Sequence, residues 1–232
     1  MKFYLSILLC LCIFFALTAC GSSPSDATTE TSDVANNTTP SAQNLPSESE
    51  TIGNTVESDA KILVLYFSRA DENYGVGVIE KGNTQIIAEM IAEETGGDLF
   101  HIERDTPYPA AYDACTDEAK TEQNNNARPA LKEDIDISSY DVIFFGYPNW
   151  WGDMPMHVYT FLENHDFTGK IVLPFCTHAG SGLSGTVNTL KNKCSGATVT
   201  SGLAIPGTTA QNKQDEAKKS VQDWLGEQKM LK

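Results

Sequence analysis

A loop rich in hydroxyl, amide and glycine residues follows an apolar run, and its residue types suit a phosphate group. Ser68 ends the apolar residues 62–67, Arg69 is the only strong cation close by, and Gly-Asn-Thr at 82–84 opens an amphipathic segment. Unpaired amides and the positive end of a helix dipole at such a loop favour an anion. We therefore predict a site for one phosphate monoester, held by Ser68, Arg69, Gly82, Asn83 and Thr84.

The same loop lacks the two common nucleotide motifs. There is no GxxxxGK[ST] sequence, and the glycines at 75, 77 and 82 do not have the GxGxxG spacing. A nucleoside-triphosphate site and a dinucleotide site are therefore disfavoured. The alternative to a phosphate site is that Ser68 is only a turn residue and Thr84 only a helix cap.

Two further loops follow apolar runs and have unusual compositions. Residues 148–155, PNWWGDMP, place two of the three tryptophans in a loop, where a planar aromatic ligand would cover their rings. Residues 177–182, THAGSG, present small residues whose amides can approach a polar ring edge. The residues predicted to contact such a ligand are Pro148, Asn149, Trp150, Trp151, Gly152, Thr177, His178, Ala179, Gly180, Ser181 and Gly182.

The three loops need a scaffold that brings them together, and the periodicity of residues 61–232 predicts one. Apolar runs without polar alternation are typical of strands covered on both faces, and each is followed by helical spacing. This order predicts one α/β domain with a doubly wound sheet of five parallel strands and helices on both faces. Ligands bind such sheets beyond the carboxyl ends of the strands, where strand order reverses. The predicted strands are residues 62–67, 98–104, 141–147, 170–177 and 197–205, and the predicted helices are residues 84–95, 112–124, 156–164, 183–192 and 211–228.

Four local features refine this scaffold. Asn83 or Thr84 is expected to cap the first helix. Residues 98–104 are more polar than the other strands and are expected at a sheet edge. Pro174 has no amide hydrogen, so we expect a bulge or a locally unpaired position there. The long connection that contains residues 112–124 is either a crossover or a shelter for a ligand.

The N-terminal region predicts export and a tether. Residues 1–20 have one lysine before an apolar run that is too short to span a membrane comfortably, as in signal peptides. Their ending, LTAC, resembles the lipobox of bacterial lipoproteins, which implies lipidation of Cys20. The alternatives are a cut after Ala19 or an uncleaved anchor. Residues 21–60 are rich in Ser and Thr and lack Lys and Arg, which predicts a disordered tether. The predicted location is extracytoplasmic, on the bacterial cell membrane.

Charge and cysteine content restrict the partners. The net charge is −15 at pH 7, which disfavours nucleic acid and limits membrane contact to the lipid anchor. The scattered histidines and the absence of CxxC predict no metal site. After export, Cys115, Cys176 and Cys194 are either buried free thiols or include one disulfide between Cys176 and Cys194.

In the three loops described above the chain resembles flavodoxins, and the resemblance covers essentially all of residues 61–232. In that family a hydroxyl-rich loop holds the FMN phosphate, and Ser68 with residues 82–84 is similar. An aromatic residue next to Gly-Asp covers the isoalloxazine ring, and Trp151-Gly152-Asp153 is similar. The loop at 177–182 corresponds to the one that borders the other side of the flavin. The resemblance implies a flavodoxin-like fold and FMN as cofactor.

The chain departs from the flavodoxin pattern in two places. Residues 70–81 are an insertion that splits the phosphate loop, and the roles of Arg69 and Tyr74 stay open. The loop at 177–182 has no tyrosine to stack on a flavin, so His178 either lies beside the ring or is a solvated loop histidine. It is assigned no acid-base role.

The resemblance implies an FMN-binding electron-transfer protein, with redox proteins or small electron acceptors as partners and no catalytic residue. One alternative is an NAD(P)H-dependent flavin or quinone reductase of the same fold. A second is a surface binding module without flavin. Steady-state oxidation of NADH or NADPH, and colour after addition of FMN, separate the three.

Overall fold

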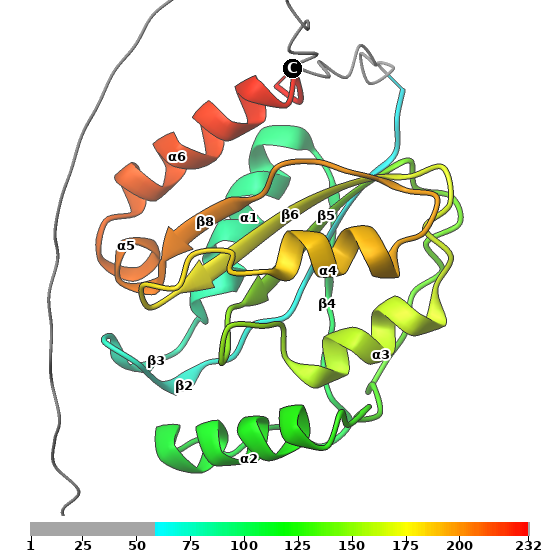
Figure 1. Ribbon diagram of the computed structural model, residues 1–232. Coiled ribbons are helices and arrows are strands. Elements are labelled where there is room, and N and C mark those ends of the chain that lie inside the picture. The colour runs from blue at the N-terminus through cyan, green and yellow to red at the C-terminus, as the bar shows by residue number, and fades with distance from the viewer. Residues whose placement is uncertain (1–58, 232) are drawn as a thin grey trace, which may run out of the picture. The chain divides into compact units, whose positions relative to one another are not determined.

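The computed structural model describes residues 59–231, in which strands and helices alternate (Figure 1). The predicted signal peptide, Cys20 and nearly all of the predicted tether lie outside the described residues. Within them, no helix has the length and apolar character needed to cross a membrane. The strands are β1 (Ile62–Tyr66), β2 (Asp71–Asn73), β3 (Gly77–Ile79), β4 (Asp98–His101), β5 (Val142–Pro148), β6 (Ile171–His178), β7 (Thr198–Val199) and β8 (Leu203–Pro206). The helices are α1 (Asn83–Thr95), α2 (Tyr112–Asn124), α3 (Met156–Asn164), α4 (Thr186–Lys193), α5 (Gly207–Asn212) and α6 (Gln214–Glu227).

The main sheet is parallel throughout and has the order β4-β1-β5-β6-β7, with β8 beside β6 further along that strand. The predicted doubly wound sheet is confirmed, and β7 and β8 together take the place of the fifth strand. β4 lies at the edge, as its polar composition predicted. The chain runs outward from β1 to β4 and then returns to β5, so strand order reverses between β1 and β5.

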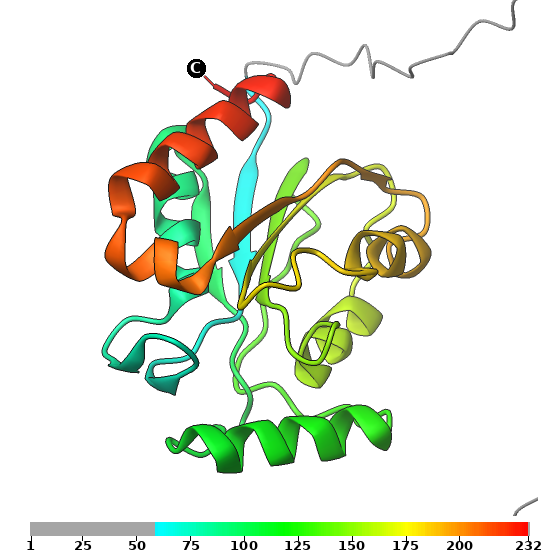
Figure 2. The same ribbon diagram turned by 60° about the vertical axis from the view of Figure 1, so that its left-hand side comes forward.

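Both faces of the sheet are buried, which explains the unbroken apolar runs. Leu63 and Leu65 belong to a core shared with α2, α3 and α4, whereas Val64 and Tyr66 belong to a core shared with α1 and α6. Figure 2 shows helices on both sides of the sheet. Consecutive strand residues point to opposite faces. A strand covered on both faces must therefore be apolar at every position.

The last predicted strand is divided in two, opposite Pro174. β6 pairs with β5 in continuous register through Pro174, so the predicted bulge is wrong. On the other edge, β6 pairs with β7 at Ile171 and Val172 and with β8 from Phe175 onward, so a local loss of pairing is confirmed. Val172 accepts a hydrogen bond from the Thr200 amide on that edge. Strand alternation places the nitrogen of Pro174 on the same edge, where it has no hydrogen to donate.

Three other predicted elements differ in the structure. The helix predicted from residue 183 begins at Thr186, after a turn in which Ser184 has a φ of 50°. The helix predicted over 211–228 is two helices, α5 and α6, separated at Lys213, whose φ of −140° is not helical. The insertion at 70–81, for which no element was predicted, contains the antiparallel hairpin of β2 and β3.

The cysteines of the described region are buried free thiols at positions 115, 176 and 194. The disulfide between Cys176 and Cys194, one of the two predicted alternatives, is therefore wrong. Burial raises the pKa of both thiols to about 12. They remain protonated at neutral pH and act as small apolar residues in the core.

Glu163 at the end of α3 predicts a measurable acid dependence of stability. Its carboxylate accepts hydrogen bonds from Arg128 at 2.7 and 2.9 Å and from Lys193 at 2.7 Å, and these partners lower its pKa to about 2. A lowered pKa stabilises the fold above about pH 4.5, and this stabilisation is lost as the pH falls toward about 2. Because the side chain is 37% exposed, the loss is about 0.5 to 1 kcal/mol.

Urea unfolding of the Glu163→Gln variant at several pH values measures this effect. We expect the variant to be less stable than the native chain at neutral pH and equally stable near pH 2. Glu227→Gln, at an exposed position of α6, is the control and should follow the native pH profile. A constant difference between Glu163→Gln and the native chain at all pH values would contradict the assignment.

Candidate functional site

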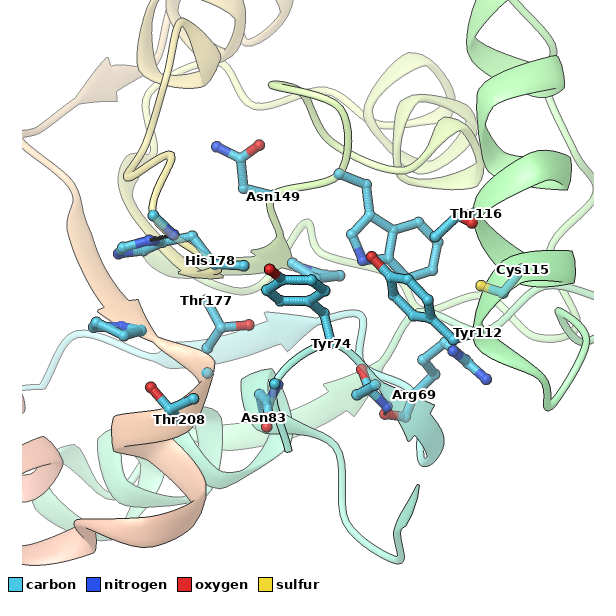
Figure 3. Close-up of a pocket in the computed structure, with 18 of the residues that line it drawn as sticks. Arg69, Tyr74, Asn83, Tyr112, Cys115, Thr116, Asn149, Thr177, His178 and Thr208 are labelled. Atoms are coloured by element: carbon cyan, nitrogen blue, oxygen red, sulfur yellow. Dashed lines mark hydrogen bonds between the residues drawn. The ribbon is translucent and has the colours of Figure 1, made fainter. Parts of the chain in front are cut away.

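A cavity of about 450 Å³ opens beyond the carboxyl ends of β1, β5 and β6 (Figure 3). This is where strand order reverses, and the volume is in the range of small-molecule sites. The predicted loops supply Arg69, Asn83, Pro148, Asn149, Trp150, Trp151, Thr177, His178, Ala179 and Gly180 to its wall. The other predicted residues, Ser68, Gly82, Thr84, Gly152, Ser181 and Gly182, do not line it.

Ser68 and Thr84 hold the first loop in place through hydrogen bonds of their hydroxyl groups. The Ser68 hydroxyl accepts a hydrogen bond from the amide of Gln85 at 3.1 Å, and the Thr84 hydroxyl bonds to that of Thr177 at 2.7 Å. Gly82 is the N-cap of α1 and offers no side chain. The expected cap by Asn83 or Thr84 is therefore wrong, because Ser68, in the loop after β1, accepts the hydrogen bond from the open amide of Gln85. A second hydrogen bond holds the loop that contains Ser68: Nε2 of His101 lies 2.9 Å from the Ser68 carbonyl oxygen.

The start of α1 retains its positive character. No acidic residue lies in its first turn, so nothing there offsets the helix dipole. Asn83 from this turn reaches the cavity wall, and its Oδ1 is buried without a hydrogen-bond partner. A buried acceptor of this kind is costly until a donor binds to it.

Arg69 lines the cavity but uses its guanidinium to hold the surrounding chain. Nη1 donates to the carbonyl of Glu72 at 2.9 Å, and Nη2 donates to the carbonyls of Pro109 and Ala110 at 2.9 and 2.8 Å. These bonds join the inserted hairpin to the segment before α2. The positive charge of Arg69 remains in the cavity wall.

Asn149 connects the second and third loops. Its Nδ2 donates to the carbonyl of Gly182 at 2.6 Å and to the hydroxyl of Ser184 at 2.9 Å. The backbone N–H of Asn149 donates to the carbonyl of Thr177 at 2.8 Å. The Oδ1 atom is buried without a partner, which makes Asn149 a second acceptor available to a polar ligand in the cavity.

The tryptophan loop is a tight turn that holds an indole at the cavity rim. Trp150 and Asp153 exchange backbone hydrogen bonds of 2.8 and 3.0 Å, and Trp151 and Gly152 have φ values of 54° and 80°. A non-glycine residue in this region is strained, which is typical of functional sites. Trp151 is 54% exposed, and its Nε1 donates to the carbonyl of Thr116 in α2. Trp150 is instead packed against Phe67.

Residues 177–180 of the third loop line the cavity. Nδ1 of His178 accepts a hydrogen bond from the amide of Gly180 at 2.9 Å, which turns the chain at this point. Burial lowers the pKa of His178, so its imidazole is neutral at pH 7. His178 lines the cavity, and its place beside a flavin ring stays a prediction.

Other parts of the wall were not predicted as contacts. They come from the inserted hairpin, from α2 and from the start of α5, and the residues are Asn73, Tyr74, Gly75, Tyr112, Cys115, Thr116, Ala119, Pro206, Gly207 and Thr208. The long connection around residues 112–124 was the available signal for α2. Residues of α2 line the cavity, and shelter of a ligand by this connection stays a prediction. Within residues 59–231, no three His, Cys, Asp or Glu side chains gather as a metal-binding group.

Comparison with known proteins identifies the family. The flavodoxin family model matches residues 61–225. The chain belongs to the flavodoxin family. A candidate flavoprotein from Bacteroides eggerthii is similar to this flavodoxin, with 31% identity and a TM-score of 0.58 over 72% of this chain and 97% of that one. One from Bacteroides uniformis has 28% identity and a TM-score of 0.57 over 72% and 98%. No curated protein matches the chain.

A flavoprotein from Lactobacillus acidophilus, crystallised with FMN, has 25% identity and a TM-score of 0.49 over 67% of this chain and 99% of that one. Family membership supports FMN as the cofactor of this flavodoxin. The residues present fit such a group, because the cavity combines an uncompensated helix start, two buried acceptors without partners and an exposed indole.

Proposed function

We propose that this flavodoxin is an FMN-binding electron carrier held outside the cytoplasm by a lipid on Cys20. The observation that carries the proposal is the convergence of three loops, distant in sequence, on one cavity at the switch point of the sheet. The start of α1 and Trp151 lie at that same cavity, as one bound flavin requires. The tether and the lipid rest on the sequence of residues 1–60 alone.

The cavity residues divide into three roles. The open amides at the start of α1, shaped by Ser68 and Thr84, would receive the phosphate. Asn83 and Asn149 would accept hydrogen bonds from donor groups of the cofactor through their free Oδ1 atoms. Trp151 would cover the ring system. When bound, FMN supplies the electron-transfer chemistry, and the protein tunes its potential.

An acidic protein around the site affects both potential and partners. The chain carries a net charge of −15 at pH 7, so a cofactor that gains negative charge on reduction is disfavoured and its potential falls. Redox partners with a basic docking surface, or small uncharged acceptors, are favoured for the same reason.

Reconstitution of the purified chain with FMN tests the proposal. We expect one FMN per chain after gel filtration, a visible spectrum shifted from that of free FMN, and a raised melting temperature, because a ligand that binds only the folded state stabilises it. The reduced protein should pass electrons to a one-electron acceptor and should not oxidise NADH or NADPH in steady state. A colourless protein after reconstitution would indicate a binding module without flavin, and steady NADH oxidation would indicate a reductase.

A further inference from the structure

The inserted hairpin places an exposed aromatic ring at the cavity. Tyr74 lies at the tip between β2 and β3, is 65% exposed, and projects into the cavity in the view of Figure 3. Five large apolar side chains are exposed among the described residues, and two of them are aromatic: Tyr74 and Trp151. Both line the cavity. An exposed aromatic ring that lines a cavity is a candidate contact for a ligand.

The hairpin is braced on two sides, so Tyr74 stands on a fixed support. The Glu72 carboxylate accepts a hydrogen bond from the amide of Tyr112, the first residue of α2, at 2.9 Å. Arg69 ties the Glu72 carbonyl to that of Ala110. On the other side Gly75 approaches α5, where a Cβ on Gly75 would lie 3.5 Å from Cγ2 of Thr208.

The third loop contains no Tyr, Trp or Phe at residues 177–182, and its one ring is the small imidazole of His178. Trp151 comes from the second loop and is held against α2. Tyr74 comes from the first loop, and its ring centroid lies 6.0 Å from that of Tyr112 at an interplanar angle of 42°. This separation leaves no room for another ring between the two tyrosines, since stacked rings need about 3.5 Å on each side. A flavin ring could therefore contact Tyr74 only from the side away from Tyr112, and Tyr74 lines the cavity.

We infer that Tyr74 is a cofactor-binding residue that contacts the isoalloxazine ring system and provides the second aromatic wall of the site. The inference rests on the proposed FMN function. The insertion that splits the phosphate loop thus gains a role, since it carries a tyrosine side chain of the kind that the third loop lacks. Its contact is with the ring and not with the phosphate.

Affinities for FMN and for riboflavin, which lacks the phosphate, test this assignment. Tyr74→Ala should weaken the binding of both ligands by about tenfold, because removal of one aromatic stacking partner costs about that factor. Tyr74→Phe should bind both within about twofold of the native chain. Val78→Ala is the matched control, since Val78 lies on the same hairpin, is 82% exposed and does not line the cavity. The melting temperatures of the three apoproteins should be equal.

The outcomes separate the inference from the function on which it rests. Equal affinities of Tyr74→Ala and Val78→Ala for both ligands would overturn the inference and leave FMN binding in place. A loss for FMN alone would also overturn it, because the contact would then involve the phosphate. Failure of the native chain to bind FMN would overturn the proposed function itself.

Discussion

An alanine at position 82 is expected to weaken FMN binding by about a hundredfold or more, which corresponds to about 2.8 kcal/mol. A Cβ atom on Gly82 overlaps the Ser68 hydroxyl oxygen and the Arg69 carbonyl oxygen, and it lies 2.8 Å from the Arg69 carbonyl carbon. Both residues must move. The Ser68 hydroxyl then leaves the amide of Gln85, and the guanidinium of Arg69 pulls on the segment before α2. The open amides of the phosphate loop lose their arrangement.

Isothermal titration of the apoprotein with FMN measures this loss, and urea unfolding should show a loss of stability of about 1 to 3 kcal/mol. Gly185→Ala is the matched control, because Gly185 is also the N-cap of a helix and has no atom within 4 Å of a Cβ built on it. The control should bind FMN like the native chain. Equal affinities for the two variants would show that the first loop does not hold the cofactor.

Gly146→Ala is expected to destabilise the fold by about 3 kcal/mol, the upper part of the usual range for overpacking. Gly146 lies in β5 between β1 and β6, opposite Phe175 of β6. A Cβ atom there overlaps the edge of the Phe175 ring, which is fully buried. Neither strand can retreat, because each is paired on both sides, and the ring must leave its rotamer.

A double-mutant cycle with Phe175→Leu identifies the overlap as the cause. Phe175→Leu alone should cost about 1 to 2 kcal/mol through the space it leaves. In the double variant leucine makes room for the new methyl group, so the loss should be clearly smaller than the sum of the two single losses. Additive losses in denaturant unfolding would mean that the ring is not what opposes a side chain at position 146.

The sequence predicted the architecture because local rules and the global fold agree along most of this chain. The apolar run that ends in Phe67 predicted a strand covered on both faces, and β1 is such a strand. The loops after β1, β5 and β6 followed from the rule that ligands bind beyond the carboxyl ends of parallel strands. The cavity wall accordingly includes Arg69, Asn149 and His178, all named from sequence.

Contacts between distant segments were beyond such rules. Ser68 caps α1 across 17 residues, whereas local spacing pointed to Asn83 or Thr84. The strand predicted over 197–205 divides because a proline in its neighbour has no hydrogen to donate. The inserted hairpin gained its position from bonds of Glu72 and Arg69 to the region of α2, and no periodicity within residues 70–81 encodes those partners.

By itself, the sequence determined the parallel sheet, its order of strands and helices, and the three loops at its ligand-binding edge. Those properties depend on apolar periodicity and turn chemistry, which act between near neighbours. Tertiary structure alone decided which side chain caps α1, that the inserted hairpin lines the cavity beside α2, and that Tyr74 lies at the cavity. Those outcomes depend on which distant surfaces meet, and a linear pattern of residues does not carry that information.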